Sequence, residues 1–250
     1  MKRIFISALV LFFVLPPAIA AGESDRDMSV EFKAGPIYFD KIDSEPSLEG
    51  NTPFKDVFDS DNRLFVQGEF NYQFFQNFGS LSALLGAGYT RFKGKSFFEL
   101  ANDNSQEEDE GSQALEQSSD ETTFMAIPIF IGAAYRFDVI YRGFKIPLVP
   151  YLKGGGEYIL WWSLNGSGNT SESELGGKGR GGRKGFFFRP GAQLALNWLD
   201  PDAGKHFDLS SGINESYFFV EYSIDEVNDF SNDGLNLSYR TWFLGLMFEF

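Results

Sequence analysis

The sequence predicts an all-β fold, an antiparallel up-and-down β-barrel of about eight strands. Two observations carry this prediction. Apolar and polar residues alternate along segments of roughly ten residues, and the polar stretches that join these segments alternate between long and short. The chain has 250 residues with 29 Phe, yet 22% of its residues are charged and its mean hydropathy is slightly negative. The apolar residues are therefore dispersed, which excludes a helical membrane protein and a disordered chain.

Residues 1–20 have the pattern of a secretory signal peptide. Lys2 and Arg3 precede an apolar run from residue 4 to residue 15, and Ala18 and Ala20 supply small residues at the cleavage positions. We expect cleavage before Ala21, which leaves one barrel domain over residues 21–250. An N-terminal membrane anchor is the alternative, but the run is short for a bilayer span.

The clearest alternation lies in residues 64–74. Leu64, Val66 and Phe70 occupy even positions, whereas Gln67 and Glu69 occupy odd ones, and only a strand sorts a period of two onto two faces. The same reasoning predicts eight strands in chain order, at residues 28–39, 64–74, 80–97, 127–137, 152–162, 186–198, 215–225 and 239–250.

The connections predict which end of the barrel faces outside. Long polar stretches occupy residues 40–62, 99–121, 163–185 and 225–237, and shorter joins occupy residues 75–79, 138–147 and 199–214. Transmembrane β-barrels have long outer loops, short periplasmic turns and, for an even strand number, both termini in the periplasm. Asp200-Pro201 resembles the start of a helix, so we also expect a short periplasmic helix over residues 200–210.

Charged residues share the polar face of the strands, and in hydrocarbon each of them would cost several kcal/mol. The polar face therefore points into the barrel and the apolar face points to lipid. Heights along neighbouring strands predict the pairs Lys33–Glu69 and Glu157–Arg189, and Lys153 with Glu221 across the lumen. The alternative is that these charges line a water-filled pore. The predicted interior network comprises Lys33, Glu69, Arg136, Lys153, Glu157, Arg189 and Glu221.

The lipid-facing register of residues 80–97 continues into Arg91, Lys93 and Lys95. Three cations at the outer headgroup level would bind lipopolysaccharide phosphates. The alternative is that the strand simply rises above the membrane there. Outer-membrane lipid and lipopolysaccharide are therefore the expected partners of this face.

The four long stretches carry nearly all of the acidic excess. The whole chain has 35 Asp and Glu against 21 Lys and Arg, a formal net charge of -14, which argues against nucleic acid as a partner. Dense carboxylates such as Glu107, Glu108, Asp109 and Glu110 are expected to bind divalent cations weakly, although mere solvation and mutual repulsion would explain them too. Residues 176–185 are Gly-rich and basic but lack a P-loop pattern, so we interpret them as a flexible outer loop.

The last strand resembles the assembly signal that outer-membrane barrels present to the barrel-assembly machinery. Its alternating apolar residues are Trp242, Leu244, Leu246, Phe248 and the C-terminal Phe250. The segments PIFIGAAYRFD (128–138), IPLVPYLKGGGEYILWW (146–162) and YFFVEY (217–222) resemble a family of small outer-membrane barrels from myxobacteria and related δ-proteobacteria. That resemblance implies fold and outer-membrane location in a Gram-negative cell; it implies no catalytic residues.

Three functions remain after these steps. Zero Cys excludes disulfides, Cys-ligated metals and thiol nucleophiles, and no motif calls for a cofactor or a metal. A lipid-modifying barrel enzyme would use a His near the outer leaflet, but the single His206 falls in a predicted periplasmic join. We therefore expect no catalysis, and favour a barrel with a side-chain-filled interior and a structural or surface-interaction role. A narrow porin-like channel for small solutes is the alternative, since eight strands enclose little space.

Overall fold

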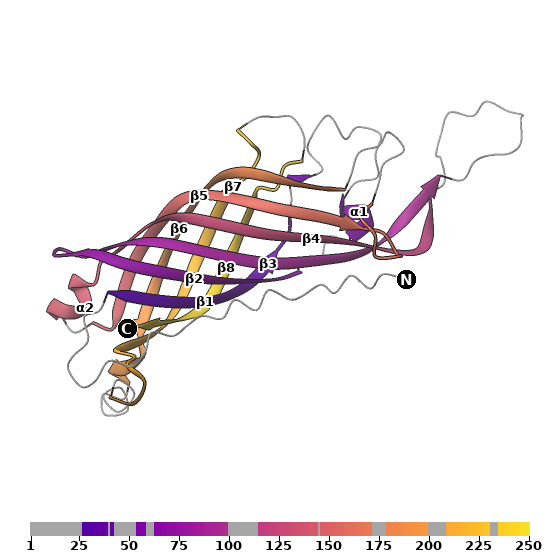
Figure 1. The fold of residues 1–250 in the computed structure, drawn as a ribbon. Coiled ribbons are helices and arrows are strands. Elements are labelled where there is room, and N and C mark those ends of the chain that lie inside the picture. The colour runs from indigo at the N-terminus through magenta and orange to yellow at the C-terminus, as the bar shows by residue number, and fades with distance from the viewer. Residues whose placement is uncertain are drawn as a thin grey trace, which may run out of the picture.

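The protein forms a closed barrel of eight strands in the computed structural model, which describes residues 27–39, 41–42, 54–58, 63–99, 115–144, 146–171, 179–199, 209–230 and 235–250 (Figure 1). Within these ranges, the structure describes the backbone but not the side chains of residues 55, 56, 96–99 and 115–120. The elements are β1 (Met28–Ile37), α1 (Phe54–Phe58), β2 (Arg63–Gln76), β3 (Ser80–Glu99), β4 (Leu115–Arg136), α2 (Val139–Phe144), β5 (Leu148–Leu164), β6 (Arg180–Ala195), the 3-10 helix η3 (Leu196–Trp198), β7 (Glu215–Glu226) and β8 (Tyr239–Glu249).

Every strand pairs antiparallel with the next strand in the chain, and β8 pairs with β1 to close the barrel. The predicted eight-stranded antiparallel up-and-down barrel is confirmed. The backbone N–H of Met28 donates to the carbonyl of Phe250, so the start of β1 and the C-terminus lie at one end of the barrel together with α2. We call this the terminal end; α1 lies at the opposite end, which we call the loop end (Figure 1).

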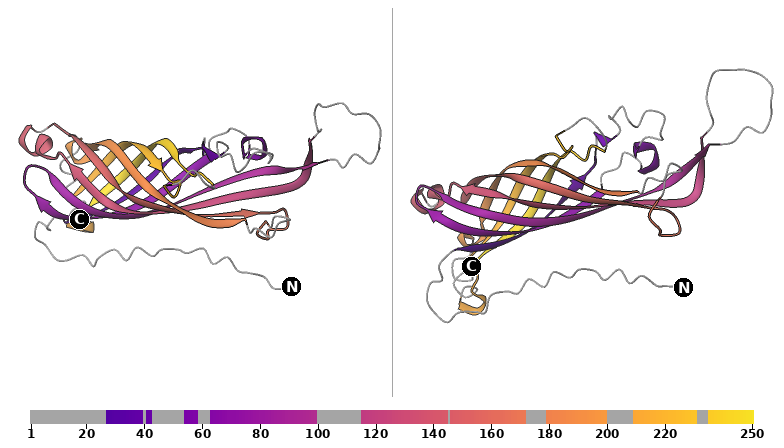
Figure 2. Two further views of the ribbon diagram at one scale, coloured as in Figure 1. Left: turned by 90° about the horizontal axis from the view of Figure 1, so that it is seen from above. Right: turned by 45° about the horizontal axis from the view of Figure 1, so that its top comes forward.

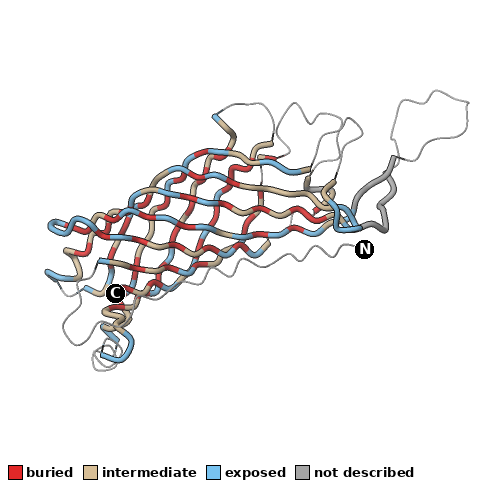
Figure 3. The backbone as a smooth tube through the Cα atoms, viewed as in Figure 1, coloured by how far each residue is buried: buried red, intermediate tan, exposed pale blue. Residues whose placement is uncertain are grey.

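Burial alternates along the strands, as Figure 3 shows. In β2, Gln67, Glu69 and Asn71 are buried, whereas Leu64 and Tyr72 are exposed. The polar face therefore points into the barrel and the apolar face points outward, the reverse of a soluble barrel. Large exposed apolar side chains occur on the outer wall of each of the eight strands, including Phe32, Leu85, Ile131, Leu152, Phe188, Phe218 and Leu244.

The β3–β4 hairpin is longer than predicted and projects beyond the rest of the barrel (Figure 2). Residues 99–121 were predicted to form a loop, but β4 begins at Leu115, which pairs with Glu99 of β3. The β4 strand of this hairpin begins with mostly polar residues, so composition favoured a loop there. Its alternation continues nevertheless, since Phe92 and Phe124 point inward while Arg91 and Lys93 are exposed.

Residues 180–185 were also wrongly predicted as part of a flexible loop. They form the start of β6, in register with Glu157 to Trp162 of β5. Close approach of the backbone requires glycine at position 185, where a Cβ would lie 1.9 Å from the carbonyl oxygen of Glu226. A Cβ on Gly182 would lie 2.0 Å from the Tyr158 hydroxyl, so that side chain would have to move. The Gly-rich composition thus reflects tight packing in a strand.

Short helices interrupt two predicted connections and one predicted strand. α1 lies in the expected 40–62 loop, α2 in the expected 138–147 join, and β6 ends at Ala195, followed by η3. The expected helix over residues 200–210 lies almost entirely outside the described residues, as does the predicted signal peptide. Among the helices that are described, none combines the length and apolarity needed to cross a bilayer.

Candidate functional site

The interior of the barrel is the first candidate site, and the lumen-facing residues of β7 order it from end to end. Glu215 lies nearest the terminal end, followed by Glu221 and Asp225, and Val227 follows the strand at the loop end. All four are buried. Each belongs to a different layer of contacts, so the lumen is filled in four successive layers.

The second layer is an ion cluster centred on Lys153 of β5. Its Nζ lies 2.5 Å from Glu31 of β1, 2.7 Å from Glu69 of β2 and 3.2 Å from Glu221 of β7. These partners belong to strands on different sides of the lumen, so their side chains must meet across it. The Lys153 ammonium group therefore bridges strands that share no backbone hydrogen bonds with β5.

Lys33 of β1 completes this cluster. Its Nζ lies 3.2 Å from Glu69 and 2.6 Å from Glu221, and all three side chains have zero exposed fraction. The Tyr151 hydroxyl donates to Glu221 at 3.1 Å. Lys33, Lys153, Glu31, Glu69 and Glu221 are named the ion cluster below.

Arg189 of β6 forms the third layer. Its guanidinium group lies 2.8 Å from Asp225 and 3.4 Å from Glu157. The same group lies 4.3 Å from the ring centre of Phe130 and 4.2 Å from that of Phe187. Aromatic faces on a desolvated guanidinium group add cation–π attraction to the ion pairs, so this cation is held by both charge and packing.

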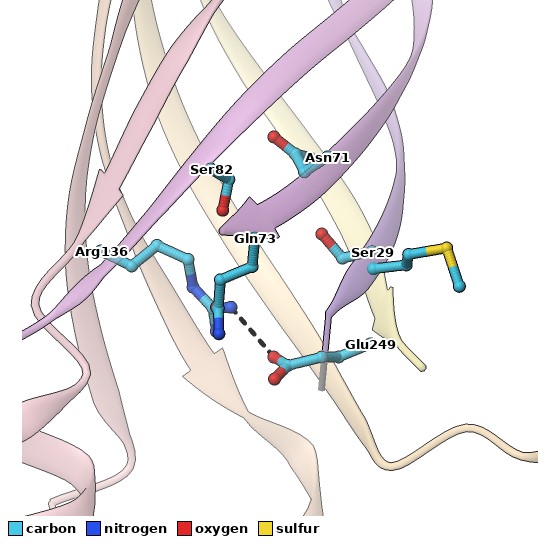
Figure 4. A pocket seen from close by; sticks show the side chains of 7 residues that line it. Ser29, Asn71, Gln73, Ser82, Arg136 and Glu249 are labelled. Atoms are coloured by element: carbon cyan, nitrogen blue, oxygen red, sulfur yellow. Dashed lines mark hydrogen bonds and ion pairs between the residues drawn. The ribbon is translucent and has the colours of Figure 1, made fainter. Parts of the chain in front are cut away.

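The terminal end holds the first layer, built on Arg136 and Glu249. Their side chains pair at 2.9 Å, with exposed fractions of 8% and 6%. Arg136 also lies over the Tyr217 ring, whose hydroxyl donates to Glu215. A small polar pocket opens beside the pair (Figure 4), lined by Met28, Ser29, Asn71, Gln73, Ser82, Arg136 and Glu249.

The fourth layer, at the loop end, is aromatic. Phe39 packs on Phe92 of β3 at 5.6 Å and on Tyr239 of β8 at 6.0 Å between ring centres, so it bridges the lumen. Phe54 of α1 packs on Phe124 at 5.3 Å. We call this layer the aromatic plug; its buried members are Ile37, Phe39, Ile42, Phe58, Phe65, Phe92, Phe124, Ala126, Ile159, Val227, Leu237, Tyr239 and Phe243.

Acidic groups outnumber basic groups inside the barrel. Among the buried side chains of the described strands, seven are carboxylates and four are bases; an eighth buried carboxylate, Asp138, lies in the turn after β4. No group of three or more His, Cys, Asp or Glu in the described part of the chain has the geometry of a metal site. The arrangement can hold ion pairs and exclude solvent, and its carboxylate excess would favour cations over anions.

The structure brings all seven predicted interior residues into buried contacts. Lys33 meets Glu69, Arg189 meets Glu157, and Lys153 meets Glu221 across the lumen. Arg136 lies apart from these, at the terminal end.

The sequence analysis missed Glu31, Asp225 and Glu249 as partners. Glu31 shares the strand parity of Lys33 and Asp225 that of Glu221, whereas Glu249 alternates with the outward residues named on its strand, so parity alone could have identified all three. The inward-facing Phe residues of the aromatic plug also carry the polar-face parity, and no signal in the sequence separated them.

The outer wall is the second candidate site. Arg91, Lys93 and Lys95 of β3 are exposed on the outward face, and Lys93 lies 3.7 Å from the exposed Glu121. On β8, Trp242, Leu244 and Leu246 are exposed, and Phe248 and Phe250 are half-buried. His206 and the acidic residues 107–110 lie outside the described residues.

Comparison with known proteins gives similarity of fold only. No protein-family model and no curated protein sequence matches the chain. Ail of Yersinia pestis shares 13% identity at a TM-score of 0.41, covering 90% of this chain and 97% of its own. Neisserial surface protein A shares 13% identity at a TM-score of 0.41, and the alignment covers 89% of this chain and 97% of that protein. The outer membrane protein OprG of Pseudomonas aeruginosa shares 12% identity at a TM-score of 0.45, and the alignment covers 92% of this chain and 98% of that protein. At such values the similarities assign no role to this chain.

Proposed function

We propose that the protein is an integral β-barrel of the Gram-negative outer membrane, with a sealed interior and a structural or surface-interaction role rather than a catalytic one. The predicted signal peptide and the exposed apolar outer wall support the location, because that wall would be unstable in water. In this orientation the terminal end faces the periplasm and the loop end faces outside.

The observation that carries the sealed interior is that the lumen is crossed twice, by the ion cluster in the second layer and by the aromatic plug in the fourth. Side chains of the ion cluster meet across the lumen at 2.5 to 3.2 Å, and the aromatic plug bridges it again through Phe39. An eight-stranded barrel has an interior just wide enough for side chains to fill. Water and ions therefore have no continuous path past two such layers.

Planar-bilayer recording tests this proposal. We expect no steady conductance from the purified protein, and none from a variant that opens only one obstruction, such as Phe39→Ala. A variant that adds both Lys153→Ala and Arg189→Ala should conduct, because it also opens the Arg189 layer between the two obstructions. Steady conductance of the unmodified protein would overturn the sealed interior.

A narrow cation-selective channel is the second candidate, favoured by the seven buried carboxylates against four bases on the described strands. The channel predicts a different result in the same bilayer recording. If the unmodified protein conducts and Glu157→Gln lowers its cation selectivity, the channel replaces the sealed barrel as the function.

Lipopolysaccharide is the proposed partner of the outward cations Arg91, Lys93 and Lys95. Each surface cation contributes about 1 kcal/mol of attraction to an anionic membrane. Reversing all three charges with Glu should reduce co-purifying lipopolysaccharide, measured as lipid phosphate per barrel. Unchanged lipid content would instead mean that the β3–β4 hairpin stands above the membrane at this point.

The barrel-assembly machinery is the proposed partner of β8 during insertion. Its outward residues Trp242, Leu244, Leu246, Phe248 and Phe250 retain the alternation of the predicted assembly signal. Deleting Phe250 should slow accumulation of folded barrel in cells without changing the stability of protein refolded in vitro.

A further inference from the structure

The turn after β7 holds a bulky aromatic residue in a backbone conformation that such residues rarely adopt. Asp229 and Phe230 have φ angles of 58° and 59°. Left-handed backbone at a residue such as Phe persists only where the surrounding contacts fix it, and such positions cluster at functional sites. The surroundings of this turn therefore indicate what the conformation achieves.

Four hydrogen bonds fix the turn. The backbone N–H of Asp229 donates to the Lys184 carbonyl at 2.9 Å, and the Asp229 carboxylate accepts from the Lys184 N–H at 2.9 Å. The Arg183 guanidinium group also donates to that carboxylate. Asn228 Oδ1 accepts from the Phe230 N–H at 3.1 Å. These bonds hold the turn against Arg183 and Lys184, near the start of β6.

The tie places Phe230 on the outer wall of the barrel. Its ring stacks on Phe186 of β6, with 6.4 Å between ring centres and 9° between planes. Both rings are largely exposed, at 65% for Phe230 and 50% for Phe186. A turn that merely connected two strands would gain nothing by displaying this aromatic pair outward.

A cation and a tyrosine lie beside the aromatic pair. Lys184 is the next outward residue of β6 toward the loop end; it is exposed, and its charge also helps to lower the pKa of the neighbouring Asp229 carboxyl group. Tyr158 is its register partner on β5, and the Tyr158 ring extends over Gly182 toward the loop end. The wall thus changes from apolar at Phe186 to charged at Lys184, as interfacial sites do.

We propose that Tyr158, Lys184, Phe186 and Phe230 form a binding site for one lipopolysaccharide molecule, with a phosphate on Lys184 and an acyl chain against the two Phe rings. The proposal rests on the outer-membrane location proposed above. Lipopolysaccharide fits the patch because it combines a phosphate with packed acyl chains at the outer end of the barrel. The residues of this site lie on β5, β6 and the turn after β7, at least two strands from the β3 cations, so the two sites are separate.

The first experiment measures the membrane depth of residue 230. The chain has no Cys, so single-cysteine variants can be spin-labelled cleanly in protein refolded into phosphatidylcholine vesicles containing lipopolysaccharide. Labels at Phe230→Cys should contact dissolved oxygen as a lipid-facing label at Leu244→Cys does, while a label at Ser167→Cys in the β5–β6 turn should contact aqueous nickel.

These three labels separate the two proposals. If the label at position 244 is exposed to water, the outer-membrane barrel itself is wrong. If position 244 lies in lipid but position 230 behaves like position 167, the barrel stands and the lipid site is overturned.

The second experiment titrates dansyl-labelled lipopolysaccharide onto the protein in phosphatidylcholine nanodiscs. Lys184→Gln should weaken binding about fivefold, the effect of one surface cation, and Lys184→Arg should restore it. Phe230→Ser should weaken binding severalfold with unchanged circular dichroism. Arg142→Gln, at the terminal end, is the matched control and should have no effect. If Lys184→Gln leaves binding unchanged, or if phosphatidylglycerol competes as well as unlabelled lipopolysaccharide, the site is refuted.

Discussion

The two halves of the lumen differ in what fills them, and the charged Arg189 layer lies between the ion cluster and the aromatic plug. The terminal half holds the ion cluster, in which Lys153 contacts three carboxylates. The loop half holds the aromatic plug, in which Phe39 crosses the lumen between β3 and β8. Both fillings occupy the same strand parity, so the pleat determines that a residue points inward but not whether it is charged.

The ion cluster and the aromatic plug are stabilised in different ways. A buried charge is costly unless its partner is present, so the ion cluster depends on every member. An aromatic plug depends on contact area, and neighbouring rings can move partly into a vacated space. The terminal half should therefore fail sharply when one charge is removed, whereas the loop half should weaken gradually.

The largest effect is expected from Lys153→Met. The substitution keeps the length of the side chain but leaves Glu31, Glu69 and Glu221 short of a cation, and should cost about 3–5 kcal/mol of unfolding free energy. Equilibrium urea unfolding of the protein in vesicles measures this cost. Adding Glu31→Gln should recover part of it by removing the carboxylate closest to Lys153.

A matched control uses the same substitution on the outer wall. Lys93 lies 3.7 Å from Glu121, and both side chains are more than half exposed. Lys93→Met should therefore change the unfolding free energy by less than about 1 kcal/mol. Equal losses at positions 153 and 93 would show that the ion cluster is hydrated and that the lumen is open.

Phe124→Ala tests the other half and should cost about 3 kcal/mol, the lower end of the range for a buried Phe. The ring packs on Phe54, Phe92 and Trp161. Phe124→Leu should recover most of the loss, because the plug needs volume rather than a particular group. Phe78→Ala, at an exposed turn, is the control. A failure of Leu to rescue would indicate that specific ring geometry holds the plug.

The sequence predicted the wall of the barrel better than its contents. Alternation fixes which residues point inward, because a one-residue slip would move every charge to the lipid face. In the structure, Lys33, Glu69 and Arg189 are buried, on the face that this alternation assigns to the lumen. The aromatic plug could not be predicted this way, since Phe39 and Phe54 lie outside the strands and meet Phe92 only in three dimensions.

The start of β6 was wrongly predicted as a loop for a related reason. The start of β6 contains Gly181, Gly182 and Gly185 and has little apolar alternation, so composition favoured a loop. Only the close approach of Tyr158 and Glu226 shows why glycine is needed there. Likewise, nothing in the sequence indicated that Phe230 would fold back onto Phe186.

Arg136→Ala should have an intermediate effect, because the pair with Glu249 borders a pocket rather than the dry centre of the lumen. Water can enter and solvate Glu249 when its partner is lost. We expect a loss of about 1–3 kcal/mol, as for a charged hydrogen bond. Arg142→Ala removes a more exposed cation paired with Asp138 on the same end and should cost less than about 1 kcal/mol. A loss at position 136 as large as that at position 153 would mean that both layers are equally dry.

The smallest effect is expected from the titration of Asp229, which lies in the turn after β7, outside both the ion cluster and the aromatic plug. Its slight burial raises the pKa of the carboxyl group, but the hydrogen bonds from the Lys184 N–H and the Arg183 guanidinium group outweigh burial and hold the pKa below its ordinary value of 3.8. A lowered pKa means that the carboxylate stabilises the turn above pH 3.8, and that this contribution is lost as the pH falls through the lower folded-state pKa. A spin label at residue 230 should therefore stay immobile from pH 7 to about pH 4 and become mobile below that range. Asp229→Asn keeps an oxygen acceptor without the charge, so it should remove the acid step. If the step persists in that variant, another carboxyl group releases the label and Asp229 does not control the turn.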